Sequence, residues 1–236
     1  MTGGPRLLVD LVRALFPGGD ATAMIAAGDI LVDGLPVTAA RSRLRPGARV
    51  TVRRAQTLRG SAKLRAALEA FEIPVAGRVA LDVGAAAGGF TAVLLQAGAR
   101  LVYAVDAGHG QLLGSLRQDP RVVNLEAVNV ADLDTGRVPD VIDVVTVDVS
   151  YLSLSSAIAQ LQRVAIAPDA ALVGLVKPMF ELRAATAPGD RASLETALAT
   201  ASAGVAEAGW EVRGSMDSPV LGARGARELL LHAVRR

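Results

Sequence analysis

The sequence predicts an α/β fold in which a mostly parallel, doubly wound sheet follows a small N-terminal segment. Short apolar runs alternate with helix-period segments over residues 63–236, which is the pattern of repeated strand–helix–strand units. The first apolar run, residues 79–83, passes directly into a loop of small residues and then into a helical segment. This order of strand, glycine loop and helix is typical of nucleotide-type sheets.

Composition limits the classes to which the chain can belong. Of its 236 residues 51% are hydrophobic, two are histidine and none is cysteine. Disulfide frameworks, thiolate metal sites and cysteine nucleophiles are excluded. With two histidines, the chain has few residues that could form a zinc site or a histidine-based triad. No apolar run reaches the roughly 18 residues that a membrane span needs, and residues 1–11 lack the features of a signal peptide. We expect a cytoplasmic protein that uses no metal and contacts no membrane.

Charge is distributed unevenly along the chain. The net charge is +2, but residues 1–63 contain ten basic and four acidic residues. A basic segment ahead of a mildly acidic body indicates either a phosphate-backbone partner or a solvated surface, and charge alone does not decide between them. Among the 25 basic residues only Lys63 and Lys177 are lysines. Either they mark positions that need a compact, titratable ammonium, or they persist by chance.

The first 62 residues predict a small α+β domain and a connector. We place the domain at residues 1–54 and a polar linker at residues 55–62. Asp20 is a suitable N-cap for the second helix, and Gly28 is its stop signal. Two helices and two strands are expected, at residues 6–17, 20–28, 30–32 and 49–53.

Residues 63–236 predict the large sheet. A helix with one apolar face, residues 63–71, precedes it, and further helices are expected at residues 90–97 and 193–208. Seven strands are expected, at residues 79–83, 101–106, 121–126, 141–147, 171–176, 210–216 and 227–234.

The loop after the first strand indicates the cofactor. It reads Gly-Ala-Ala-Ala-Gly-Gly, so the dinucleotide fingerprint G-x-G-x-x-G is absent. It is closer to the D-x-G-x-x-x-G-G-F form of S-adenosylmethionine (SAM) methyltransferases, whose donor carries no pyrophosphate. A tight turn in a related domain that binds another ligand is the alternative.

Further polar residues follow later strands. Because ligands bind at the carboxyl ends of strands in open α/β sheets, these residues should line one crevice. Asp106 is spaced to accept hydrogen bonds from a ribose, and Asn129 is expected where an adenine edge would lie. The predicted SAM-binding residues are Asp82, Gly84, Ala85, Gly88, Gly89, Phe90, Thr91, Asp106, Asn129 and Asp148.

Ordered motifs carry a resemblance to a known family. They are DVGAAAGGFT, VYAVDAGHGQL with LRQDPRV, VDVSYLSL, LVKPMFE and GARELLLH. With them the chain resembles, over nearly its whole length, the TlyA family, often labelled hemolysin A. Those ribosomal RNA 2′-O-methyltransferases join an S-four-type RNA-binding domain to a methyltransferase domain related to FtsJ. The resemblance implies a class I SAM-dependent methyltransferase with a seven-stranded Rossmann-like sheet, parallel except for the last strand. It also implies an S-four-like first domain and ribosomal RNA as partner.

The resemblance further implies a catalytic group of two lysines, an aspartate and a glutamate. The family's motif before the domain falls on residues 59–64 and assigns Lys63; the later motifs assign Asp148, Lys177 and Glu228. The only two lysines of the chain thus coincide with the two that the family requires. A ribose hydroxyl is a weak nucleophile that benefits from a base or from stabilisation of its alkoxide. Lysine in a dry cleft can act as base, which arginine cannot. We expect Lys177 to be the base or the stabiliser, oriented by Asp148.

Two stretches depart from the family pattern. Residues 20–23 lack the arginine usual in the first domain, and residues 182–190 lack the usual basic, glycine-rich character. The aromatic content of 3% is poor for stacking exposed bases. Two alternatives therefore stay open: a divergent paralogue that methylates a small molecule such as a natural product or a resistance-related compound, and a non-enzymatic RNA-binding or hemolysin-like protein. The target nucleotide and the oligomeric state are not predicted.

Overall fold

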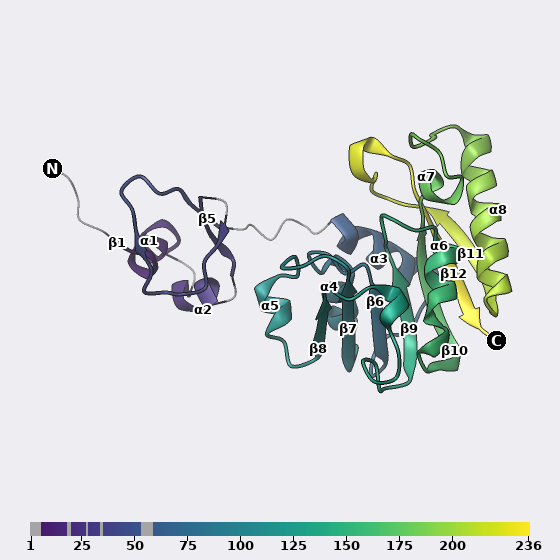
Figure 1. Cartoon of the computed structure of the whole chain (residues 1–236), viewed down its shortest axis with the longest axis horizontal. Coiled ribbons are helices and arrows are strands. Elements are labelled where there is room, and N and C mark those ends of the chain that lie inside the picture. Colours follow the sequence, from purple (N-terminus) through teal and green to yellow (C-terminus); the bar gives the residue numbers. More distant parts are fainter. Residues whose placement is uncertain (1–5, 18–19, 27, 34, 53–58) are drawn as a thin grey trace. The chain divides into compact units, whose positions relative to one another are not determined.

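The chain forms two compact units (Figure 1). The computed structural model describes residues 6–17, 20–26, 28–33, 35–52 and 59–236. One unit comprises Met1–Gln56 with Leu113–Pro120, and the other comprises Thr57–Leu112 with Arg121–Arg236. Most of the predicted linker, residues 55–58, lies outside the described residues, so the predicted boundaries at residues 54 and 62 stay a prediction.

The first unit is a small α+β arrangement. Its central strand β2 pairs antiparallel with β3 and β5, and β1 pairs with β4. Leu8, Val12 and Ile25 are fully buried in its core. The carboxylate of Asp20 accepts from the amides of Thr22 and Ala23, which is the predicted helix cap. The elements are β1 (Arg6–Leu7), α1 (Leu8–Leu15), α2 (Ala21–Ala26), β2 (Ile30–Val32), β3 (Leu35–Pro36), β4 (Arg43–Leu44) and β5 (Val50–Val52).

The second unit contains the predicted seven-stranded sheet. Its order is β11-β12-β10-β9-β6-β7-β8. Strand β12 runs antiparallel to both of its neighbours, whereas β10, β9, β6, β7 and β8 are parallel. The class I arrangement is thus confirmed, including the reversed last strand. The strands are β6 (Val79–Val83), β7 (Leu101–Asp106), β8 (Val122–Glu126), β9 (Ile142–Val147), β10 (Ile166–Val176), β11 (Trp210–Asp217) and β12 (Leu229–Arg235).

Helices cover both faces of this sheet. The chain steps from β6 outward to β8 and then returns to β9 on the other side of β6. Since crossovers between parallel strands are right-handed, the reversal places the later helices on the opposite face. Helix α3 packs against α4, and α6 packs against α8. The helices of this unit are α3 (Arg59–Ala70), α4 (Gly89–Gln96), α6 (Leu154–Ala159), α7 (Pro178–Glu181) and α8 (Arg191–Glu207), with 3₁₀ turns η1 (Val130–Asp132), η2 (Gln160–Arg163) and η3 (Ala223–Gly225). The short helix α5 (Gly114–Arg117) lies in the segment that groups with the first unit.

The core explains why the strands read as nearly continuous apolar runs. Side chains such as Leu81, Val145 and Leu172 are fully buried, because a parallel sheet is covered on both faces. Trp210 is buried at the start of β11. None of the helices among the described residues has the length and apolar character to cross a membrane.

Helix α3 begins earlier than the sequence predicts. It starts at Arg59, so Lys63 lies in its second turn instead of at its start. A Cβ atom at Gly60 would lie 3.2 Å from the ring of Phe90. The glycine therefore permits close packing of α3 on α4, although in the sequence it looks like part of a polar connector.

Candidate active site

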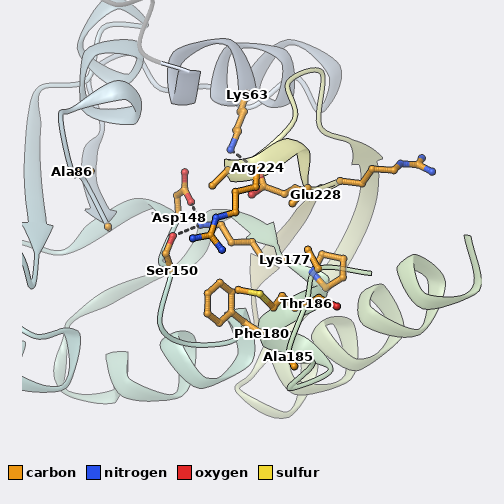
Figure 2. A pocket seen from close by; sticks show the side chains of 17 residues that line it. Lys63, Ala86, Asp148, Ser150, Lys177, Phe180, Ala185, Thr186, Arg224 and Glu228 are labelled. Atoms are coloured by element: carbon orange, nitrogen blue, oxygen red, sulfur yellow. Dashed lines mark hydrogen bonds and ion pairs between the residues drawn. The ribbon is translucent and has the colours of Figure 1, made fainter. Parts of the chain in front are cut away.

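A cavity of about 790 Å³ opens where β6, β9 and β10 end (Figure 2). The strand order reverses between β6 and β9, and ligands of α/β sheets bind at such switch points. The lining combines residues of the β6–α4 loop, the segment after β9, the start of α7, helix α3 and the β11–β12 loop. Among them are all four predicted catalytic residues, Lys63, Asp148, Lys177 and Glu228, together with Gly84 of the predicted donor loop.

Lys177 and Asp148 form an ion pair inside the cavity. The Lys177 Nζ lies 2.5 Å from Asp148 Oδ1, and the side chains are 12% and 22% exposed. The same Nζ donates to the carbonyl of Val149 at 2.8 Å and to Ser150 Oγ at 2.9 Å. An ammonium has three donors, so three acceptors fix its position. Lys177 directly precedes α7, where Pro178 is the first helical residue.

A second ion pair, between Lys63 and Glu228, lies deeper. Lys63 Nζ contacts Glu228 Oε2 at 2.6 Å, and the two side chains are 7% and 6% exposed. Glu228 precedes β12, and its backbone carbonyl accepts from the amide of Ser218 across the β11–β12 loop. A Cβ at Gly222 would lie 2.1 Å from Glu228 Oε1. A side chain there would displace the carboxylate, so the loop backbone packs directly on it.

The predicted donor loop makes a tight turn at the cavity. Gly84 has φ 87°, and a Cβ there would lie 2.4 Å from the carbonyl oxygen of Asp148. The amides of Gly84 and Ala85 both donate to the carbonyl of Val105, at 2.8 and 3.0 Å. Gly88, with φ 93°, caps α4. These constraints leave the backbone of Gly84 and Ala86 on the cavity wall, where a ligand can approach closely.

Asp106 is placed next to this loop. Its Oδ2 accepts from the amide of Ala86 at 2.8 Å, and its Oδ1 accepts from the amide of Gly108 at 2.6 Å. Each carboxylate oxygen has two lone pairs, so acceptor capacity remains for ribose hydroxyls. Asn129 caps η1 by accepting from the amide of Ala131 at 3.1 Å, which leaves its NH₂ group to donate. This acid, amide and loop fit the ribose and adenine of SAM, although Asp106 and Asn129 lie beyond the lining of the cavity.

Three residues predicted to bind SAM face the interior instead. The buried Asp82 carboxylate accepts from Thr91 Oγ1 at 2.6 Å and from Thr146 Oγ1 at 2.9 Å. Burial raises the pKa of Asp82 to about 6, against the opposing effect of these hydrogen bonds. Thr91 and Phe90 are buried as well. The geometry does not support side-chain contact of these three with SAM; they hold the loop and α4 against β6 and β9.

Sequence reasoning missed several lining residues. Ser150 helps to position Lys177, and Phe180 and Arg224 also line the cavity. Arg224 lies between Gly222 and Gly225 in the loop that carries Glu228. Ser150 and Phe180 fall within the motifs VDVSYLSL and LVKPMFE, but no spacing assigns a role to either. For Arg224 the only signal is a glycine on either side of it, shortly before a predicted catalytic acid.

The sheet and this site define a class I SAM-dependent methyltransferase. The family profile of the FtsJ-like methyltransferases matches residues 57–235. The chain belongs to the FtsJ-like methyltransferases and, within them, to the TlyA family.

Known proteins resemble the chain over most of its length. It is 41% identical over 220 residues to the 16S/23S rRNA (cytidine-2′-O)-methyltransferase TlyA of Mycobacterium tuberculosis, which covers 89% of this chain and 82% of that relative. It is 34% identical over 224 residues to Hemolysin A of Brachyspira hyodysenteriae, and the match covers 91% of this chain and 92% of that relative. A solved structure of a hemolysin-like protein from Streptococcus thermophilus matches with a TM-score of 0.70 at 29% identity, covering 99% of this chain and 90% of that one.

Proposed function

We propose that this enzyme methylates a ribose 2′-hydroxyl in ribosomal RNA. The observation that carries the proposal is the Lys177–Asp148 ion pair, held in one cavity with the Lys63–Glu228 pair and the donor-loop residue Gly84. This arrangement suits activation of a hydroxyl beside a methyl donor. The name of the Mycobacterium tuberculosis relative, a 16S/23S rRNA (cytidine-2′-O)-methyltransferase, supports the choice of acceptor.

The donor would be held by the β6–α4 loop. The backbone of Gly84 and Ala86 would lie against it, the Asp106 carboxylate would accept from its ribose, and the Asn129 amide would meet its adenine. SAM, when bound, supplies an electrophilic methyl group on a sulfonium sulfur. The loop and the Lys177–Asp148 pair border the same cavity, so the methyl group and the acceptor hydroxyl can be aligned for in-line displacement.

Lys177 stabilises the acceptor oxygen during the reaction. As the new O–CH₃ bond forms and the S–CH₃ bond breaks, negative charge on the oxygen is offset by the ammonium, which its three acceptors hold in place. The hydroxyl proton passes to Asp148. Its second carboxylate oxygen, Oδ2, makes no hydrogen bond with the described residues, and a side chain that is 22% exposed can release the proton to solvent.

The Lys63–Glu228 pair positions the wall of the cavity. It joins α3 to the β11–β12 loop, and both of its charges are satisfied within the protein. It therefore fixes the loop opposite Lys177 without placing an unpaired charge beside the reacting groups.

We further propose that residues 1–54 form an S-four-like RNA-binding domain, joined by residues 55–62 to the methyltransferase domain at residues 63–236. The order of helices and strands in the first unit and the exposed arginines Arg41, Arg43 and Arg49 support it. Replacing these three arginines with glutamate should weaken binding of ribosomal RNA at least 10-fold and leave SAM affinity unchanged. Unchanged RNA affinity, measured by filter binding, would contradict this role.

Methyl transfer from labelled SAM to ribosomal subunits tests the main proposal. Subunits from cells that lack the gene are incubated with the wild-type enzyme or with Lys177→Arg, and the RNA is digested to nucleosides. A 2′-O-methyl nucleoside is expected with the wild type only. Tight SAM binding without methylation of either subunit would overturn the proposal and favour a small-molecule acceptor.

A further inference from the structure

Arg224 is held in an unusual conformation at the mouth of the active-site cavity. It lies in η3 with φ 56° and ψ 26°, a left-handed conformation that residues with side chains rarely adopt. A closed turn imposes it: the amide of Gly222 donates to the carbonyl of Ala226 at 2.8 Å, and the amide of Ala226 donates to the carbonyl of Ala223 at 3.2 Å. Such strain persists where the surrounding structure fixes the backbone.

The turn is anchored to the Lys63–Glu228 pair. Gly222 packs on the Glu228 carboxylate so closely that a Cβ would lie 2.1 Å from it, and Glu228 is itself bound to Lys63. The position of Arg224 is therefore fixed relative to the predicted catalytic residues. Figure 2 shows its side chain extending from η3 into the cavity toward Lys177 and Ser150.

Arg224 differs from the other cations of the cavity in having no partner. Lys177 is paired with Asp148, Lys63 with Glu228, and Arg227 with Asp217 at 3.4 Å. Across the part of the chain that the structure describes, no carboxylate or other side chain is bonded to Arg224, which is exposed. The cavity thus presents one free guanidinium beside Lys177.

We propose that Arg224 binds the phosphodiester on the 3′ side of the target ribose. This inference rests on the proposed 2′-O-methylation. The 2′-hydroxyl and the 3′-phosphate are carried by adjacent ribose carbons, so a hydroxyl placed at Lys177 brings that phosphate close to the same wall. The planar guanidinium forms two parallel hydrogen bonds to phosphate oxygens. The acceptor is then a nucleotide within a polynucleotide. A free nucleoside is excluded as acceptor because it has no phosphate for Arg224 to bind.

Three variants and a matched control test the inference. Arg224→Gln removes the charge, Arg224→Lys keeps it without the planar fork, and Arg224→Gly also relieves the left-handed strain, so it should fold at least as well as the wild type. Arg100→Gln is the control, because Arg100 is an exposed arginine just before β7, at the amino-terminal ends of the parallel strands, whereas the cavity lies at their carboxyl ends. Methyl transfer to ribosomal subunits is measured over a range of subunit and salt concentrations, and SAM affinity is measured by calorimetry.

The Gln and Gly variants should raise KM for the subunits about 10- to 100-fold and leave SAM affinity unchanged. The slope of log affinity against log salt should fall by about 1. Arg224→Lys should be intermediate and Arg100→Gln unchanged. If the wild type methylates the subunits and Arg224→Gln matches its KM and salt slope, the inference fails and the proposed function stands. If the wild type methylates neither subunit, the proposed function fails and this inference fails with it.

Discussion

Lys63 and Glu228 lie 165 residues apart in the chain, yet their charged atoms are 2.6 Å apart inside the protein. Removing one partner leaves the other charge buried without compensation, which costs about 3–5 kcal/mol. Lys63→Met and Glu228→Leu should each lower the free energy of unfolding by that amount in denaturant titrations. The double variant should regain most of the stability, because neither charge is then buried. Additive losses would show that the two charges are not coupled.

The Lys177–Asp148 pair should be required for turnover but not for donor binding. Asp148→Asn should lower kcat about 10²- to 10³-fold, because Lys177 loses its charged partner and the hydroxyl loses its proton acceptor. SAM affinity, measured by calorimetry, should change only a few-fold. Ser150→Ala is the matched control, since it removes one neutral acceptor of Lys177 and should lower kcat less than about 10-fold. Equal losses in the two variants would contradict these roles.

Gly84→Ala should be far more disruptive than Gly77→Ala. Both glycines have positive φ, 87° and 73°, which costs a residue with a side chain about 1–2 kcal/mol. Only at Gly84 would the new Cβ also meet backbone, 2.4 Å from the Asp148 carbonyl; at Gly77 no atom lies within 4 Å. The loss in unfolding free energy should therefore be larger at Gly84 by about 1–3 kcal/mol. Only Gly84→Ala should also lose SAM binding; similar behaviour of the two variants would contradict the close approach.

Asp82 should make stability fall as pH rises. Its pKa in the folded protein is about 6, raised from 3.8 mainly by burial. Between pH 4 and 6 the folded state therefore binds more protons than the unfolded state, so the free energy of unfolding declines over that window and is lowest above it. The shift corresponds to about 3 kcal/mol.

Asp82→Asn isolates this effect, because asparagine keeps a similar shape and does not titrate. The stability of the wild type relative to the variant should fall by about 2 kcal/mol between pH 4 and pH 7. Guanidinium titrations at the two pH values measure it. A difference that is independent of pH would show that Asp82 titrates normally.

Most of the sheet could be predicted because its strands are buried on both faces. Residues 79–83 and 101–106 coincide with β6 and β7, since covered parallel strands leave long apolar runs. Strand β10 begins earlier than predicted, at Ile166, with an irregularity in its pairing between Ile166 and Ala171. The exposed Pro168 and Asp169 in that stretch conceal the strand in the sequence.

The site was predictable only where ordered motifs contain its residues. Lys63, Asp148, Lys177 and Glu228 were assigned from ordered motifs, and the structure gathers them at one cavity. The sequence predicts Asp82 in the donor site because it precedes the loop, but side chains alternate across a strand, and this one points into the interior. Arg224 could not be foreseen, because its position depends on how a long loop folds back on Glu228.

The place of β12 in the sheet has a consequence for protein synthesis. Strand β11 is followed in the chain by β12, yet β12 lies between β11 and β10, and within the described structure β11 pairs with β12 alone. A nascent chain that has not yet released residues 228–235 from the exit tunnel therefore lacks both the carboxylate that binds Lys63 and the strand that joins β11 to the sheet. Pairing of β11 with the sheet and closure of the Lys63–Glu228 pair therefore wait until residues 228–235 have left the ribosome.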